Sequence, residues 1–263
     1  MTTVLCVPQW QGSAHARAPR LTEGAHRASA LITADTVVTV PTPGTTPKSG
    51  GIRARDTLIE VQRRTFEALE GVDDRIITVG GDCAVDIPSI ATAHDRYGDA
   101  LTVLWIDAHP DVYSPSTLPS GAFHGMVVRA LLGDDELAGL TPDRPLKPSQ
   151  VIIAGERAGA DSEHAYLREQ GIRRYGVPDL HRAFEGLTGP VYVHVDLDVL
   201  DPEVFGSTCY PEPGGVHPDR LADLIAGLDG VIGAALTEHA PLNQIPHEDN
   251  VIRTVSEALN SAF

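Results

Sequence analysis

Residues 191–202 read VYVHVDLDVLDP, a run of mostly apolar and β-branched residues followed by three aspartates and a proline. Residues 101–111, LTVLWIDAHPD, have the same arrangement, with an apolar run that changes abruptly into acidic residues and a histidine. Near-continuous apolar runs of this length are typical of strands that are buried on both faces of a parallel sheet. We therefore expect strands over residues 101–107 and 191–198, each with acidic side chains at its carboxyl end.

The rest of the chain repeats this alternation of apolar runs and longer polar segments. Four more segments have strand character: 3–7, 75–80, 150–155 and 231–238. Amphipathic stretches at residues 55–71 and 218–230 predict helices between them, the second opening with Pro218-Asp219 and closing at Gly230. Strands that alternate with helices predict an α/β fold, a three-layer α/β/α arrangement with a mostly parallel sheet. We expect residues 1–263 to form a single domain of this kind.

The composition excludes several classes of partner. Asp and Glu outnumber Lys and Arg by 36 to 20, so the net charge of −16 argues against binding to nucleic acid or to an anionic membrane. The three cysteines are widely spaced and include no CxxC pair, which indicates a reducing compartment rather than a disulfide framework. No apolar run approaches the length of a membrane span. We expect a soluble protein of the cytoplasm.

The acidic residues at the two strand ends have the spacing of metal ligands. Asp107, His109 and Asp111 are two residues apart, so an extended backbone would direct all three side chains to one side. Pro110 is expected to end that strand, and Asp196 and Asp198 repeat the pattern on the other one. Either pair alone would most simply be two solvated carboxylates in a loop. Both pairs together with a histidine would repel strongly unless a divalent cation such as Mn²⁺ bound between them.

Four motifs in series resemble those of a known family. They are Gly80-Gly81-Asp82-Cys83, Asp107-Ala108-His109-Pro110-Asp111, His124-Gly125 and the run from Asp196 to Pro202. In order and spacing, over about residues 75 to 241, they are similar to the motifs of the ureohydrolases, which include arginase, agmatinase and formiminoglutamase. The resemblance implies the arginase/deacetylase-type fold and a homo-oligomer, either a trimer or a hexamer. It also implies hydrolysis of a small guanidino or amidine substrate.

The resemblance further implies a cluster of two manganese ions. Asp107 and Asp196 would bridge the ions, Asp111 and residue 83 would complete the first, and His109 and Asp198 would complete the second. A hydroxide between the ions would attack the guanidinium carbon and release urea and an amine. A strong nucleophile is needed because guanidinium is a poor electrophile, and metals provide one by lowering the pKa of bound water.

Further positions match the family as catalytic or substrate-binding residues. His124 would move a proton to the leaving amine and Glu238 would grip the guanidinium, so we predict both, together with Asp111, as catalytic. Ser120 matches a contact to a substrate carboxylate. Tyr113 stands where arginases have asparagine, and Tyr210 follows Cys209 in a loop that departs from the family's Gly-Thr-Gly-Thr-Pro. These departures make L-arginine a doubtful substrate, because a buried amino-acid head group would lose its partners.

Cys83 stands where the family has a histidine, and three hypotheses remain open. Its thiolate could bind the first ion, which would shift the metal preference toward Zn²⁺ or Fe²⁺. It could bind nothing and leave a mononuclear Asp-His-Asp site. It could instead be a covalent nucleophile, although no base is identifiable beside it.

Two other activities are alternatives to the ureohydrolase reading. One is a deacetylase-like amide hydrolase with a single Zn²⁺, and the other is a noncatalytic protein that binds or senses a ligand. The other histidines are expected to be mostly surface or helix residues without a functional role. They are His94, His164, His181, His194, His217, His239 and His247. Arg157 is expected to form a structural ion pair or to touch the substrate.

Overall fold

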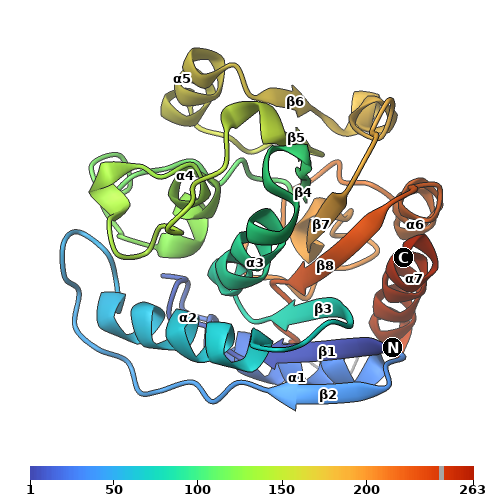
Figure 1. Ribbon diagram of the computed structural model, residues 1–263, viewed down its shortest axis with the longest axis horizontal. Coiled ribbons are helices and arrows are strands. Elements are labelled where there is room, and N and C mark those ends of the chain that lie inside the picture. Colours follow the sequence, from blue (N-terminus) through green and yellow to red (C-terminus); the bar gives the residue numbers. More distant parts are fainter. Residues whose placement is uncertain (243–245) are drawn as a thin grey trace.

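The computed structural model describes residues 1–242 and 246–263. Within these residues eight strands form one sheet in the order β2-β1-β3-β8-β7-β4-β5-β6, and each neighbouring pair is parallel (Figure 1). The strands are β1 (Thr2–Val7), β2 (Thr36–Thr39), β3 (Arg75–Gly80), β4 (Thr102–Ile106), β5 (Val151–Ala154), β6 (Arg173–Tyr175), β7 (Val191–Asp196) and β8 (Val231–Thr237). Because all of them are parallel, their carboxyl ends meet at one edge of the sheet.

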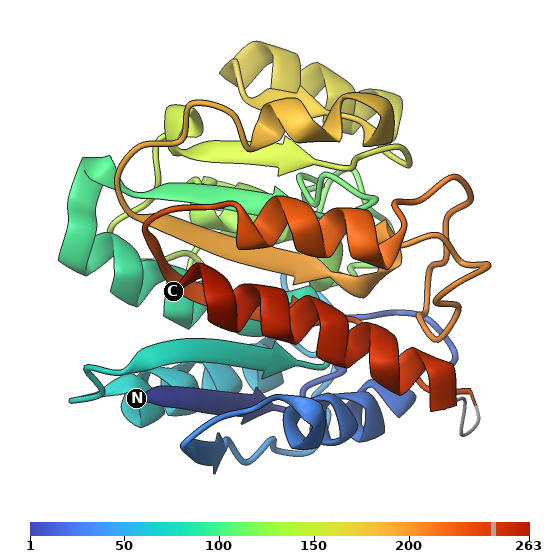
Figure 2. The same cartoon turned by 90° about the vertical axis from the view of Figure 1, so that its right-hand side faces the viewer.

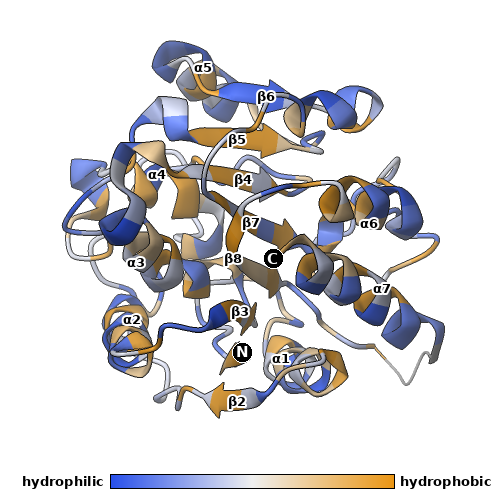
Figure 3. Cartoon of the chain, turned by 45° about the vertical axis from the view of Figure 1, so that its right-hand side comes forward, coloured by the Kyte–Doolittle hydropathy of each residue, from blue (hydrophilic) through white to orange (hydrophobic). Residues whose placement is uncertain are grey.

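Helices cover both faces of the sheet. The α-helices are α1 (Arg20–Leu31), α2 (Arg55–Leu69), α3 (Ile87–Tyr97), α4 (Val127–Leu131), α5 (Asp161–Gln170), α6 (Pro218–Ala226) and α7 (Pro246–Ala262). Short 3₁₀ turns are η1 (Cys83–Asp86), η2 (Gly98–Ala100), η3 (Phe123–Met126), η4 (Asp135–Leu137), η5 (Pro148–Gln150), η6 (Val177–Ala183) and η7 (Leu197–Val199). Helices α1, α6 and α7 lie on one side of the sheet, and α2, α3 and α4 lie on the other (Figure 3). In Figure 2, α6 and α7 are seen in front of the strands that they cover. The predicted three-layer α/β fold is confirmed.

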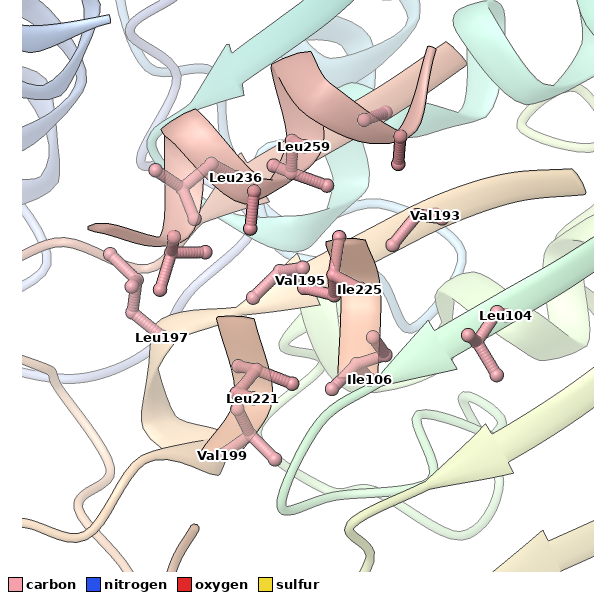
Figure 4. Close-up of a cluster of buried hydrophobic side chains, with 14 of the residues drawn as sticks. Leu104, Ile106, Val193, Val195, Leu197, Val199, Leu221, Ile225, Leu236 and Leu259 are labelled. Atoms are coloured by element: carbon pink, nitrogen blue, oxygen red, sulfur yellow. The ribbon is translucent and has the colours of Figure 1, made fainter. Parts of the chain in front are cut away.

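The central strands are apolar on both faces because both faces are buried. On one face, Val193 and Val195 of β7 meet side chains of α6 and α7, among them Ile225 and Leu259 (Figure 4). The alternate residues of β7 point to the opposite face, where Tyr192 joins Trp105 of β4 in a second cluster beneath α3. This explains why the strands read as unbroken hydrophobic runs rather than as an alternating pattern.

All six predicted strands are present, and the two that the sequence did not reveal are the edge strands. In β2 three of its four residues are exposed, and β6 begins with two exposed arginines, Arg173 and Arg174. β6 has no apolar run and β2 has only two consecutive valines between threonines, because an edge strand has little core to fill. A sequence pattern based on buried runs therefore misses both.

Two predicted boundaries were wrong. The strand expected to run as far as Pro110 ends at Ile106, since its last ladder partner is Ala154 at the end of β5. The helix expected over 218–230 ends at Ala226, and Gly227 is its C-cap. Glycine is a weak helix former, which accounts for the earlier end.

In the part of the chain that the structure describes, no helix is both long and apolar enough to span a membrane.

Candidate metal centre and active site

Four neighbouring strands bring the predicted site residues together. The order β3-β8-β7-β4 places the segment after Gly80 next to the end of β8, and the end of β8 next to Asp196 at the end of β7. β4 lies beside β7, and Asp107 follows it directly. Residues that are more than one hundred positions apart in the chain thus meet at one sheet edge, where open parallel sheets bind ligands.

Asp107, His109 and Asp198 form one group of potential metal ligands. Their ligand atoms all lie within 4.8 Å of one another. The Nδ1 atom of His109 is 3.0 Å from Asp198 Oδ2 and 3.4 Å from Asp107 Oδ1. The carboxylates are held by other donors, since Trp105 Nε1 donates to Asp107 Oδ2 at 3.1 Å and the Ala108 amide donates to Asp198 Oδ1 at 3.2 Å. These three residues are the set expected for the second ion, together with a bridging Asp196.

Cys83, Asp196 and Glu238 form another such group. The Cys83 thiol lies 3.1 Å from Asp196 Oδ2 and 3.3 Å from the hydroxyl oxygen of Thr237. Cys83 is buried in η1, directly after the Gly-Gly-Asp loop. The thiol is thus placed against the proposed bridging carboxylate.

The two groups of potential ligands described above are called the cluster. Asp111 lies beside the cluster and has an unusual backbone conformation. Its φ angle is 52°, in the left-handed region that non-glycine residues seldom adopt. Its carbonyl oxygen accepts hydrogen bonds from Val128 and Arg129, which fix this turn against α4. The carboxylate is buried, and among the described residues its Oδ2 atom has no hydrogen-bond partner. An unpaired buried carboxylate oxygen is what a missing cation would leave.

The electrostatics of the cluster favour a bound cation. Burial raises the pKa of Asp196 well above its ordinary value, and the charges of Asp198 and Asp107 raise it further. The pKa of Asp111 is likewise raised by burial and by Asp107. Burial and then Asp196 raise the pKa of the Cys83 thiol. These groups would hold protons if left alone, whereas a divalent cation would keep them ionised. The donor set therefore fits a divalent cation.

His124 and Glu238 form a hydrogen-bonded pair beside the cluster. Nδ1 of His124 is 3.0 Å from Glu238 Oε1, and the Cys83 amide donates to the same oxygen at 3.3 Å. Glu238 has a φ of 64°, and in the described residues its buried Oε2 has no partner. Burial is the largest influence on the pKa of His124 and lowers it, but the charge and hydrogen bond of Glu238 together with the charge of Asp82 outweigh burial, so the pKa is raised. The pair thus offers a proton and a free carboxylate oxygen.

A cavity of about 350 Å³ opens above these groups. The predicted residues that line it are His109, Asp111, Tyr113, Ser120, His124, Asp196, Asp198 and Tyr210. Ala14, Leu118, Ala122, Gly125 and Ala158 complete the lining and were not predicted. Most of these are small residues with no chemical signature, so the sequence offered no signal for them. Tyr210 reaches over the site, with its ring centroid 5.3 Å from that of His124 and 6.3 Å from that of His109.

The Gly-Gly-Asp loop is held by a segment near the N-terminus that the sequence did not single out. Asp82 accepts hydrogen bonds from Gln9 Nε2 at 2.9 Å and from the Gly12 amide at 2.8 Å. A Cβ on Gly81 would lie 1.8 Å from the Gln9 carbonyl oxygen, so only glycine fits there. Burial and the charge of Glu238 raise the pKa of Asp82 to about 7. Asp82 is therefore positioned to orient the loop that presents Cys83.

The ion pair expected for Arg157 is not found among the described residues, and its contact with a substrate stays a prediction. Its guanidinium contacts neither a carboxylate nor the cavity in the described residues; it donates to backbone carbonyls instead. The acceptors belong to Gly155, Asp198, Val199, Leu200, Glu212 and Pro213. Arg157 therefore ties the turn that presents Asp198 to the loop that follows it.

Two of the remaining histidines depart from the expectation of surface or helix residues. His194 lies in β7 and His239 directly follows β8; both are buried, as is His94 in α3. Nδ1 of His239 contacts the carbonyl oxygen of Gly24, away from the metal cluster. His194 contacts the cluster, as described below.

Comparison with known proteins agrees with this geometry. The model of the family described as "Arginase family" matches residues 13–260. The chain belongs to the arginase family. Arginase of Coccidioides posadasii is 28% identical over 229 residues, covering 78% of this chain and 70% of that protein. N(omega)-hydroxy-L-arginine amidinohydrolase of Streptomyces lavendulae is 28% identical over 217 residues, covering 80% and 77%.

A solved structure shows the same fold. Entamoeba histolytica arginase in complex with L-ornithine has a TM-score of 0.86 at 20% identity and covers 98% of both chains. The resemblance to ureohydrolases predicted from the motifs is confirmed at the level of the family. The roles of individual residues stay predictions.

Replacing Arg157 with methionine tests how the second-ion residues are positioned. The substitution keeps an apolar stem but leaves backbone carbonyls without donors, so we expect the free energy of unfolding to fall by about 2–4 kcal/mol. The metal affinity should fall too, because the turn presenting Asp198 loosens. Urea denaturation of the metal-free protein measures the first effect, and a metal-binding titration measures the second.

Arg144→Met is the matched control. Arg144 is exposed and faces Asp95 at 3.5 Å, so this change should stay within about 0.5 kcal/mol of the original protein. Equal stability of the two variants would contradict the positioning role of Arg157.

Proposed function

We propose that this chain is a metal-dependent hydrolase that cleaves a C–N bond of a linear guanidine or other amidine and releases urea and an amine. The observation that supports this most is the convergence of Asp107, His109, Asp111, Asp196 and Asp198 beneath a cavity. Family membership supports the same class of reaction. A solvated acidic surface would not explain why these carboxylates are buried.

The residues divide between two ions as the motifs imply. Asp107 and Asp196 would be shared, Cys83 and Asp111 would hold the first ion, and His109 and Asp198 the second. Bound ions would supply a nucleophilic water at neutral pH by lowering the pKa of that water. Oxygen and imidazole ligands suit Mn²⁺, whereas the thiol of Cys83 favours Zn²⁺ or Fe²⁺ at the first position.

The pair formed by His124 and Glu238 fits the remaining steps. The free Oε2 of Glu238 can accept a hydrogen bond from a guanidinium N–H and so orient the carbon that is attacked. When the C–N bond to the substituted nitrogen breaks, that nitrogen needs a proton. His124 is a suitable source, because the charge of Glu238 favours its protonated form.

The cavity supports a substrate whose tail is uncharged. Among its described lining residues there is no lysine or arginine to pair with an α-carboxylate, and Ser120 is the one position that matches a carboxylate contact of the family. Tyr113, Leu118 and Tyr210 instead offer apolar and aromatic surface. Asp161 is one residue from the position, occupied here by Ala160, at which the family resemblance implies an acidic partner for an α-ammonium group; it is exposed at the start of α5 and is not part of the lining. L-arginine is therefore a poor match for this cavity.

Three finer expectations from the motifs stay predictions: manganese as the metal, assembly as a trimer or hexamer, and a cytoplasmic location. Metal analysis of the purified protein and sedimentation would check the first two.

A panel of guanidino and amidino compounds tests the proposed function directly. The protein is freed of metal with a chelator and then assayed for urea release with added Mn²⁺ or Zn²⁺. We expect metal-dependent urea from compounds with uncharged tails, with kcat/KM at least ~100-fold above that for L-arginine. Acetate release from an acetylated amine by protein holding one ion would support the deacetylase alternative. Ligand-induced stabilisation without turnover of any amidine would support the noncatalytic alternative.

Replacing His124 with asparagine separates proton transfer from metal binding. We expect kcat to fall by ~10²–10⁴-fold while the metal content stays the same, because His124 is outside the ligand set. His164→Asn is the control, since His164 contacts Glu156 and is not part of the cavity lining. An unchanged kcat in His124→Asn would rule out the proton-transfer role.

A further inference from the structure

His194 lies directly beneath the metal cluster. It is fully buried in β7, two residues before Asp196, so strand alternation places both side chains on the same face of the sheet. Its ring stacks on Trp105 of β4, with 3.5 Å between the centroids and 2° between the planes. The imidazole is therefore rigidly held one strand position below the proposed ligands.

The orientation of the ring is fixed by a carboxylate. His194 Nδ1 is 2.9 Å from Asp86 Oδ2, and the other oxygen of Asp86 accepts a hydrogen bond from the Tyr192 hydroxyl at 2.5 Å. With Nδ1 donating to Asp86, Nε2 keeps a free lone pair. Histidines that bind metals commonly donate their second ring nitrogen to a carboxylate in this way.

The lone pair on Nε2 faces the cluster without a good hydrogen-bond donor. Its polar neighbour in the described residues is the Thr237 hydroxyl at 3.4 Å, and that hydroxyl also lies 3.3 Å from Cys83 Sγ and 3.4 Å from the Val195 carbonyl oxygen. A threonine hydroxyl has a single proton and can satisfy only one of these acceptors. A satisfied core histidine would have a partner for each ring nitrogen, so this geometry leaves Nε2 available.

Cys83, Asp107 and His194 meet at this point. Their ligand atoms lie within 4.8 Å of one another, and all three residues are buried. We propose that His194 Nε2 is a ligand of the first ion, together with Cys83 and Asp107. The nitrogen ligand that the ureohydrolase motif places at residue 83 would then come from the adjacent strand β7.

This proposal rests on the proposed function, because both assume that a divalent ion binds in the cluster. Its new content is a mixed sulfur, nitrogen and oxygen donor set at the first position. Such a set is typical of Zn²⁺ and is poorly suited to Mn²⁺. We therefore expect the first position to select zinc, whereas the second position, with oxygen ligands and His109, tolerates either ion.

X-ray absorption of the unmodified zinc-loaded protein tests the donor set without any substitution. With two zinc ions bound, we expect one sulfur at about 2.3 Å and two imidazole nitrogens at about 2.0–2.1 Å for every two ions. Absence of sulfur, or a single imidazole for every two ions, would overturn the proposal.

Competition with a chelator tests His194 itself. We expect His194→Gln and Asp86→Asn each to weaken Zn²⁺ binding at one position by ~10–100-fold, with a smaller effect on Mn²⁺. His239→Gln is the matched control, because His239 is equally buried but contacts only the Gly24 carbonyl among the polar groups described, and its Zn²⁺ affinity should not change. Unchanged Zn²⁺ affinity in His194→Gln would overturn the proposal.

The metal measurements and the urea assay separate this proposal from the proposed function. Zinc binding that depends on His194, in a protein that releases no urea, would support the site and refute the hydrolase. Urea release by a protein whose zinc affinity is independent of His194 would support the hydrolase and refute the site. If His194→Gln does not fold, the absorption spectrum of the unmodified protein decides.

Discussion

Burial of like charges at the carboxyl edge of a parallel sheet is the constraint on which this molecule depends. Asp107, Asp111, Asp196 and Asp198 are all less than a tenth exposed, and they lie within one cluster. His109 lies against Asp107 and Asp198, and no lysine or arginine lines the cavity in the described residues. Carboxylates in such a position must either take up protons or bind cations. Binding of cations would link the fold to the hydrolytic chemistry proposed above.

The order of the strands, and not any single motif, brings the residues of this cluster together. Because β3, β8, β7 and β4 are neighbours, four separate loops deliver side chains to one place. Contacts behind the cluster then fix these loops, as with Arg157 beneath Asp198 and Asp82 beneath Cys83. The apolar side chains packed between the sheet and its helices surround these polar contacts and keep them rigid. The positions of the candidate metal ligands therefore depend on groups that are far from them in sequence.

The sequence predicted the central strands and most of the residues that meet in the cluster, because both are indicated by short segments of the sequence. An apolar run that ends in Asp-x-Asp or Asp-x-His places ligands at a strand end whatever the rest of the chain does. Features that depend on contacts between distant segments were out of reach. The left-handed turn at Asp111, the pairing of His124 with Glu238 and the approach of His194 to Cys83 arise only when strands are assembled in the observed order. The histidine in VYVHVD gave no functional signal in the sequence, and only its contact with Asp86 and its position beside Cys83 and Asp107 distinguish it.

Anomalous diffraction from crystals grown with Mn²⁺ or Zn²⁺ tests the central claim most directly, because it locates the ions without reference to activity. Two anomalous peaks in contact with both Asp107 and Asp196 are the predicted result. No peak in the cluster, or ions bound only outside it, would contradict the account.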